Sequence, residues 1–299
     1  MANVTQFETA GDGLLVRAPA KINLSLLVAG KRPDGYHNIE TLMAKVDYCD
    51  ELLFEPPNRD GIELICQGSR WAPEGEANLV WRACRALLDA AQSKQAVRVT
   101  LRKNIPAGSG LGSASSDAAA ALLGLNRFAR LRVSSQHIYD IACGLGSDVA
   151  FFLGGPLAFC TGRGEKIERI EDFFSFRAVL ALPAVNVSTK RVYENYVHNQ
   201  VLYDELSERI NALLSKKSVD SIVNLCANML QTSCFELHPE LMRPKRALEA
   251  QCMGPVLLSG SGSAMFCMVT SADLDPGCCQ SMLQDSFGCE SVVINSNRW

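Results

Sequence analysis

One stretch of the chain, residues 103–126, constrains the fold more than any other. It reads KNIPAGSGLGSASSDAAAALLGLN, in which glycine and proline residues that break regular structure are followed by serines, an aspartate and an alanine-rich run. Residues 97–103 alternate apolar and polar side chains and predict a half-buried strand. Residues 118–128 predict a helix that is buried on one face. The glycines between them carry no Cβ, so a ligand can approach the backbone there.

A glycine-rich loop before a helix is a favourable place for an anion. The first N–H groups of the helix lack partners, and its dipole places roughly half a positive charge there. A simple turn with a serine or aspartate N-cap is the alternative interpretation, and it stays open. The loop is not a P-loop, because no lysine follows its glycines. Nor is it a dinucleotide fingerprint, because Ser113 replaces the third glycine.

Composition narrows the class of protein. The chain has 299 residues, of which 47% are hydrophobic and 20% charged, enough for one large or two ordinary globular domains. A net charge of -3 does not indicate a nucleic-acid surface. The apolar runs are shorter than the about 20 residues of a membrane span, and the first residues do not resemble a signal peptide. We therefore expect a cytoplasmic protein without nucleic-acid or membrane partners.

The twelve cysteines are scattered through apolar segments without CxxC spacing. This pattern favours reduced, mostly buried side chains rather than disulfides or structural zinc. A redox or metal protein remains the alternative that the cysteine count suggests.

Two further segments carry candidate site residues near the N-terminus. Lys21 and Asn23 share one face of a predicted strand. Lys21 is either a solvated edge residue or a side chain that points into a site. A turn at 33–35 precedes Tyr36 and His37, which form either an exposed hairpin loop or a surface that stacks on and hydrogen-bonds a heteroaromatic ring.

Other candidates lie at the ends of predicted elements. Asp148 stands between a glycine turn and the apolar run 149–153, so it is either a cap or a partly desolvated carboxylate suited to be a base. Lys103 ends a strand, and we expect it to be solvated or, alternatively, near a nucleotide. A helix is expected to start at 188–189, with Tyr193 one turn on.

The remaining pattern predicts an α+β chain with strands and helices in both halves. Strands are expected in two runs within 14–30 and at 41–47, 51–55, 62–67, 157–161, 166–170, 174–183, 255–259, 264–269 and 291–294. Helices are expected at 76–91, 134–143, 186–197, 202–214, 219–230, 239–251 and 276–287. We place a domain boundary between about 161 and 174, and expect the halves to pack directly with a ligand cleft between them.

Three segments together resemble the motifs of the GHMP small-molecule kinases: PAKINL at 19–24, PAGSGLGSASSDAA at 106–119 and SGSG at 259–262. Within that family, the kinases of cytidine-diphosphate-methylerythritol in the non-mevalonate isoprenoid pathway are similar at DGYH (34–37), GSDVAFF (146–152) and GRGEK (162–166). The resemblance covers nearly the whole chain in the same order.

The resemblance implies a two-domain α+β GHMP kinase fold. Residues 1–165 would form an ATP-binding domain like domain 2 of ribosomal protein S5, and residues 166–299 a ferredoxin-like substrate-binding domain. It implies ATP and Mg²⁺, a cytidine diphosphate-linked polyol as the small-molecule substrate, transfer to its 2-hydroxyl, and a monomer or homodimer.

The resemblance also implies roles for single residues. Lys21 and Asp148 match the catalytic pair. Residues that match the substrate pocket are Asn23, Tyr36, His37, Thr189 and Tyr193. The triphosphate would lie on Pro106, Gly108, Ser109, Gly110, Leu111, Gly112, Ser113, Ser115 and Ser116, with Ser115 or Ser116 reaching the metal.

The chain departs from the usual pattern of that subfamily at several positions. Ser113 and Ala114 stand where glycines are usual, Ala150 where proline is usual, and 228–231 reads NMLQ rather than NDLE. These changes leave Lys21 and Asp148 in place and bear on the substrate more than on the reaction. A GHMP kinase for homoserine, mevalonate or a sugar, and a catalytically silent nucleotide sensor, are the alternatives.

Overall fold

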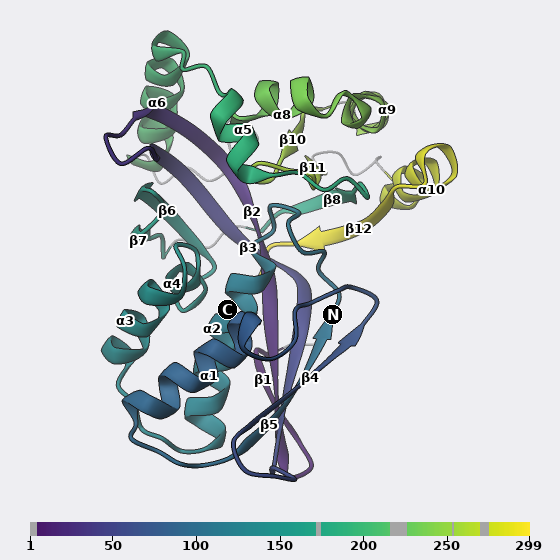
Figure 1. The fold of residues 1–299 in the computed structure, drawn as a ribbon. Coiled ribbons are helices and arrows are strands. Elements are labelled where there is room, and N and C mark those ends of the chain that lie inside the picture. The colour runs from purple at the N-terminus through teal and green to yellow at the C-terminus, as the bar shows by residue number, and fades with distance from the viewer. Residues whose placement is uncertain (1–4, 172–174, 216–225, 253, 270–274) are drawn as a thin grey trace.

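The computed structural model describes residues 5–171, 175–215, 226–252, 254–269 and 275–299. In this part of the chain two β-sheets organise the fold (Figure 1). The first sheet contains β1 (Phe7–Ala10), β2 (Gly13–Lys31), β3 (His37–Glu55), β4 (Ile62–Gly68), β5 (Val97–Lys103), β6 (Leu157–Gly162), β7 (Lys166–Arg169) and β9 (Ala227–Asn228). The second contains β8 (Arg177–Leu182), β10 (Val256–Leu258), β11 (Met265–Met268) and β12 (Glu290–Asn295).

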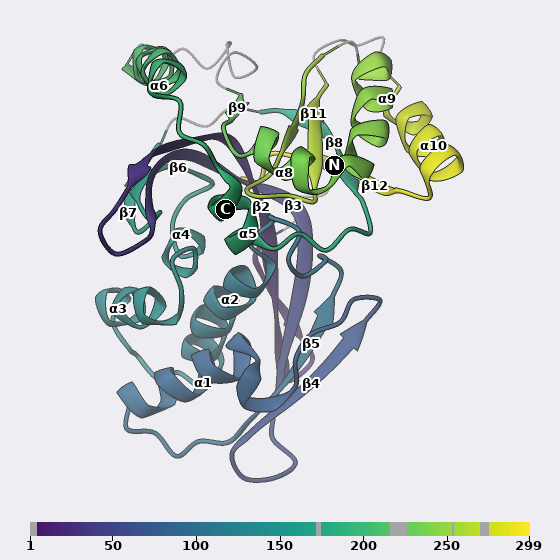
Figure 2. The same cartoon turned by 45° about the horizontal axis from the view of Figure 1, so that its top comes forward.

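Helices cover both sheets (Figure 2). They are α1 (Leu79–Ala90), α2 (Ser113–Phe128), α3 (Ser135–Leu145), α4 (Val149–Phe152), α5 (Thr189–Asn195), α6 (Gln200–Ser215), α8 (Gln231–Leu237), α9 (Met242–Cys252) and α10 (Pro276–Phe287), with 3₁₀ turns at Gly75–Ala77 and Pro239–Leu241. Within the described ranges, no helix has both the length and the apolar character needed to cross a bilayer.

The strands β2 and β3 form the long antiparallel ribbon that runs through the molecule (Figure 1). Each has 19 residues, whereas the sequence pattern predicted separate shorter strands. Their pairing shifts between Pro19 and Lys21 and again between Asn23 and Ser25. Pro19 has no N–H to donate, so the ladder bulges there instead of ending. The strand therefore stays continuous across the segment that carries Lys21.

The first hydrophobic core lies between the first sheet and α1 to α4. Helix α2 is its centre and packs very closely on the sheet. A Cβ added at Gly124 would lie 2.3 Å from Cε2 of Phe54. This close approach explains a glycine inside a helix, where it ordinarily costs up to about 1 kcal/mol relative to alanine.

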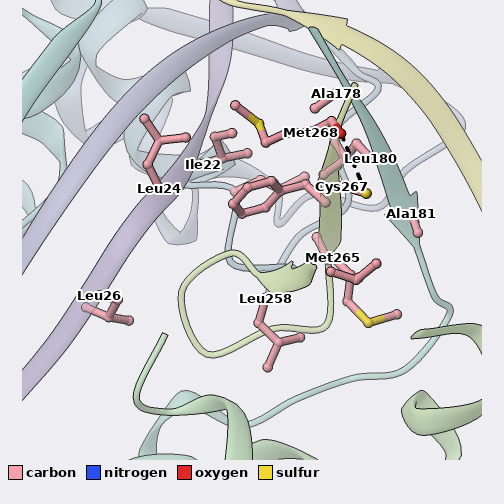
Figure 3. Packing of buried hydrophobic residues seen from close by; sticks show 14 of the residues in the cluster. Ile22, Leu24, Leu26, Ala178, Leu180, Ala181, Leu258, Met265, Cys267 and Met268 are labelled. Atoms are coloured by element: carbon pink, nitrogen blue, oxygen red, sulfur yellow. Dashed lines mark hydrogen bonds between the residues drawn. The ribbon is translucent and has the colours of Figure 1, made fainter. Parts of the chain in front are cut away.

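The second core joins the two halves of the chain. Ile22, Leu24 and Leu26 of β2 belong to the same buried cluster as Leu258 and Met265 of the second sheet (Figure 3). Because one cluster contains residues of both sheets, the halves pack directly on each other.

The second sheet has the strand order β10-β11-β8-β12, and every pairing in it is antiparallel. In chain order this is strand, helices, two strands, helix, strand, which is the ferredoxin-like arrangement. The expectation of a ferredoxin-like second half is confirmed.

The pairing of β7 with β6 decides where the chain leaves the first sheet. Strand β7 pairs with β6, so a division between residues 165 and 166 would cut a hairpin. The chain leaves the first sheet only after Arg169, and β9 later returns to pair with β2. The turn at 162–165 thus closes a hairpin of the first sheet, which favours a domain boundary after Arg169, within the expected range of about 161 to 174; the boundary itself stays a prediction.

Two sequence-based element predictions also change. Helix α2 begins at Ser113 rather than near 118, because Gly112 adopts a left-handed conformation (φ 69°) and ends the loop. The serine cluster thus forms the first helical turn. The helix expected at 219–230 lies outside the described residues up to 225, and residues 227–228 form β9.

Lys103 is buried in an ionic cluster, so the expectation of a solvated strand end is wrong. Its amine contacts Asp50 of β3, Asp117 of α2 at 2.7 Å, and the Ser113 hydroxyl. Burial alone would lower the pKa of Lys103, but the two carboxylates raise it above its ordinary value. The cluster ties β3, the end of β5 and the start of α2 together at the base of the glycine-rich loop.

Substituting Lys103 with methionine should destabilise the fold by about 3–5 kcal/mol, because two buried carboxylates lose their cation. The matched control is Arg102→Met at the neighbouring exposed position, whose guanidinium lies 3.7 Å from Glu51. That change should cost less than about 1 kcal/mol. Urea unfolding measures both, and an equally small effect at the two positions would contradict the account.

Candidate active site

A cavity of about 680 Å³ lies where the two sheets meet. Segments far apart in the sequence converge on it, and nine of the residues singled out from the sequence line it: Lys21, Asn23, Tyr36, His37, Gly110, Gly112, Asp148, Thr189 and Tyr193. The cavity therefore joins the glycine-rich loop, the lysine of β2 and the aromatic residues.

Lys21 is held at the buried end of this cavity. Its side chain is 5% exposed, so the alternative of a solvated edge lysine is wrong. The amine donates to Oδ1 of Asn23, whose own amide donates to Oγ1 of Thr41 at 2.7 Å. The Lys21 backbone N–H donates to the carbonyl of Leu111 at 2.9 Å. Strand β2 is thereby joined directly to the glycine-rich loop.

Burial lowers the pKa of Lys21 below its ordinary value, while the charge of Asp148 acts in the opposite direction. Within the described part of the chain the two side chains share the cavity without a direct ion pair. This spacing leaves room for a reacting group between them.

Asp148 occupies the N-cap position of α4, but its side chain makes no capping bond. Its Oδ1 accepts a hydrogen bond from the Ser147 hydroxyl at 3.2 Å. The hairpin turn after β6 passes close by, because a Cβ on Gly164 would lie 3.9 Å from that oxygen. The carboxylate is half-buried and faces the cavity, so it can accept a proton from a bound group.

Two glycine turns interlock beside the lysine. Gly110 has φ 81°, and a Cβ there would lie 2.0 Å from the carbonyl oxygen of Ser259. The Ser259 hydroxyl donates to the carbonyl of Gly110 at 2.9 Å and accepts from the backbone N–H of Asn23 at 3.3 Å. The loop that would bind phosphate is thus held in place by contacts with both halves of the chain.

Of the nine residues expected to contact the triphosphate, Gly110 and Gly112 line the cavity and the other seven do not. Leu111 is fully buried, the Ser109 hydroxyl donates to the Pro106 carbonyl at 2.7 Å, and Ser113 is bound to Lys103. Gly108 lies beside Asn186 at the outer side of the loop. The nucleotide contacts of these residues stay predictions.

The two serines expected at the metal differ in their surroundings. Ser115 is half-buried in the first turn of α2, whereas the buried Ser116 Oγ has no hydrogen-bond partner in the described part of the chain. An unsatisfied hydroxyl oxygen is a ligand type that Mg²⁺ accepts. Among the residues that the structure describes, no group of three or more His, Cys, Asp or Glu could hold a metal by itself.

Aromatic side chains also line the cavity, those of Tyr36, His37 and Tyr193. The His37 ring lies 5.4 Å from the ring of Tyr193 and 5.9 Å from that of Tyr196. Tyr36 is 58% exposed, and the guanidinium of Arg163 lies 5.1 Å from its ring centre. Burial, with smaller contributions from Lys31 and His198, lowers the pKa of His37, so the imidazole is neutral at pH 7.

The Thr189 hydroxyl lies 2.8 Å from that of Ser261 and links α5 to the second glycine turn. Sequence reasoning missed several functional neighbours. Arg163 lay in the GRGEK segment, and Tyr196 follows Tyr193 by three residues, so both signals were present. Ser261 lay in the SGSG segment at 259–262, whereas nothing in the local sequence pointed to Thr41 or Lys45.

Lys45 lies directly across from Lys21 in the β2–β3 register. It is 1% exposed, and its amine donates to the carbonyl oxygens of Phe152 at 3.0 Å and Gly154 at 2.8 Å. Burial, together with the nearby Arg169, lowers the pKa of Lys45 to about 7.

The sequence and the structure of this chain are similar to those of a known protein family. Residues 78–156 match the GHMP kinases N-terminal domain. A Bacillus cytotoxicus protein named 4-diphosphocytidyl-2-C-methyl-D-erythritol kinase is 39% identical over 86% of this chain and 88% of its own length. The protein of the same name from Bacillus cereus is 38% identical over the same shares.

The chain belongs to the GHMP kinase family. The crystal structure of a 4-(cytidine 5'-diphospho)-2C-methyl-D-erythritol kinase superposes with a TM-score of 0.77 at 31% identity, covering 95% of this chain and 99% of that one. A homoserine kinase from Cytophaga hutchinsonii has the same fold, with a TM-score of 0.74 at 20% identity over 99% and 98% of the two chains. This GHMP kinase is a phosphotransferase, and its family implies ATP as the phosphoryl donor.

Gly110→Ala should weaken ATP binding and lower turnover of this kinase by at least about tenfold, because the new Cβ displaces the loop from Ser259. The control is Gly30→Ala, where a Cβ meets nothing within 4 Å. Calorimetric titration with ATP and a turnover assay measure the effects. Equal ATP affinity in the two variants would contradict the assignment of the loop.

The lowered pKa of Lys45 predicts that the stability of the fold depends on pH. Its folded pKa of about 7 lies below the ordinary 10.5, so the unfolded chain binds the extra proton between these values. The free energy of unfolding therefore rises with pH across this window and falls as pH drops toward 7.

The difference in unfolding free energy, wild type minus Lys45→Met, should rise by about 1 kcal/mol per pH unit between pH 7.5 and 9.5. Urea unfolding at several pH values measures it. A difference that is flat with pH would show that the buried amine does not titrate in this range.

Proposed function

We propose that this kinase transfers the γ-phosphoryl group of ATP to the 2-hydroxyl of 4-diphosphocytidyl-2-C-methyl-D-erythritol. The observation that carries the proposal is a single cavity that Lys21, Asp148, His37 and Tyr193 all line. Its support from known proteins is the name shared by the relatives at 38–39% identity.

The glycine-rich loop suits the phosphates of ATP. Gly110 and Gly112 line the cavity, and the first N–H groups of α2 have no partner within the helix. Phosphoryl transfer requires mainly alignment and neutralisation of charge, both of which fixed backbone donors supply. Lys21 adds a cation beside the loop.

Asp148 is the group placed to accept the proton of the attacking hydroxyl. An alcohol loses its proton only as its bond to phosphorus forms, so a carboxylate within reach assists the transition state. The positive charge of Lys21 offsets charge on the moving phosphoryl group. Asn23 orients the Lys21 amine through its own bond to Thr41.

We propose that Ser115 or Ser116 holds Mg²⁺ together with the phosphates. The ion, when bound, neutralises charge on the phosphate oxygens. The unsatisfied Ser116 hydroxyl fits such a role, and Mg²⁺ needs few protein ligands because it retains waters.

The aromatic residues of the cavity suit a cytidine diphosphate. The neutral His37 ring can hydrogen-bond a pyrimidine edge, and Tyr36 and Tyr193 offer faces on which the base can stack. Lys31, Arg163 and Lys190 also line the cavity, and their charges suit a diphosphate. Thr189 links α5 to the second glycine turn.

We also propose a cytoplasmic enzyme that works as a monomer or a homodimer. Seven of the twelve cysteines are buried, which fits small hydrophobic side chains in a reducing compartment. The net charge of -3 fits a small-molecule substrate better than a nucleic acid.

The direct test is ATP consumption with 4-diphosphocytidyl-2-C-methyl-D-erythritol, mevalonate and homoserine offered separately. We expect turnover with the cytidine compound alone. Turnover with homoserine or mevalonate instead would reassign the substrate, and ATP binding without turnover on any alcohol would favour a sensor.

Asp148→Asn should fold and bind ATP with affinity within about twofold of wild type, yet lose at least about 100-fold in kcat, because the hydroxyl loses its base. Single-turnover transfer from labelled ATP measures the loss. Ser147→Ala, which removes only the neighbouring hydroxyl donor, is the control and should retain most activity. Wild-type turnover in Asp148→Asn would refute the assigned role.

A further inference from the structure

Lys45 carries a buried amine without an evident counter-ion. No carboxylate pairs with its amine among the residues that the structure describes, and the side chain is 1% exposed. An uncompensated buried amine is costly, and lysine is rarely buried unless paired. The amine instead donates to two backbone carbonyls, those of Phe152 and Gly154.

Those carbonyls belong to the segment that carries Asp148. Helix α4 spans only Val149–Phe152, so Asp148 flanks one end of it and the bonded carbonyls lie at the other. The backbone N–H of Lys45 also donates to the carbonyl of Pro156 at 2.8 Å. One residue of β3 thus holds the exit of this segment through three hydrogen bonds.

The other backbone hydrogen bonds of this segment are internal to it: Val149 donates to Gly146, Leu153 to Ala150 and Gly154 to Phe151. Glycines stand on both sides of it, at 146 and at 154–155, and allow the backbone to rotate. Phe151 and Phe152 are buried, but apolar burial is non-directional and does not fix the rotation of a single helical turn. The hydrogen bonds from the Lys45 amine restrain the rotation of α4.

The other side of the segment packs against the glycine-rich loop. A Cβ on Gly112 would lie 2.9 Å from Cζ of Phe152 and 3.0 Å from Cγ of Lys21. A rotation of α4 would therefore move the Asp148 carboxylate and the Phe152 ring together, relative to Lys21 and Gly112.

We propose that Lys45 is a positioning residue for phosphoryl transfer, which acts through α4 to hold the Asp148 carboxylate in line with the attacking hydroxyl. The inference rests on the proposed role of Asp148. It requires no contact between Lys45 and either substrate, because Lys45 does not line the cavity, whereas Lys21 and Asp148 do.

The test compares Lys45→Met with wild type in single-turnover transfer from labelled ATP. We expect kcat to fall about 10- to 100-fold while the KM values for ATP and the alcohol change less than about threefold, since misplacement by about 1 Å has effects of this size. Lys45→Gln, which keeps a hydrogen-bond donor, should lose less. Val46→Ala on the same strand, which only truncates a buried apolar side chain, should lower stability and leave kcat unchanged.

The double variant Lys45→Met with Asp148→Asn separates positioning from simple destabilisation. If Lys45 acts through Asp148, removing its amine should cost less than about threefold once the carboxylate is gone. An equal loss in both backgrounds, or an unchanged kcat in Lys45→Met, would overturn the proposal. Full activity of Asp148→Asn would instead overturn the proposed function, so the two failures are distinguishable.

Discussion

The register between β2 and β3 is the constraint on which the site depends. It places Lys21 opposite Lys45, so one lysine enters the cavity and the other holds the segment behind it. A slip of one strand by one residue would turn its side chains, and with them one of the two lysines, to the opposite face of the ribbon. The bulges after Pro19 and Asn23 set this register locally, and they lie within the segment that carries the site.

The second requirement is that two halves of the chain build one loop. Gly110 and Ser259 interlock, and the Lys103 cluster ties the start of α2 to β3. The buried cluster of β2 and the second sheet keeps these parts in fixed relation. Backbone donors that are fixed before ATP arrives need little reorganisation during transfer, which is how a loop without a lysine can serve a triphosphate.

The sequence singled out Lys21, Asp148, His37 and Tyr193, and all four line the cavity. Their roles stay predictions. What the sequence missed depends on distant partners. Lys103 is buried by Asp50, 53 residues away, and Lys45 bonds Phe152, 107 residues away, so neither environment is visible in a local pattern. The exact domain boundary within about 161–174 is not visible in a local pattern either, because it depends on the pairing of β6 with β7.

The central claim is that Lys21 and Asp148 act as one unit on the transferred phosphoryl group. A double-mutant cycle with Lys21→Met and Asp148→Asn, read by single-turnover transfer, tests it most directly. The account predicts that the double variant loses about as much kcat as the more damaging single variant, because residues that act together are strongly non-additive. If the fold loss of kcat in the double variant equals the product of the two single losses, the residues contribute independently, and the account is contradicted.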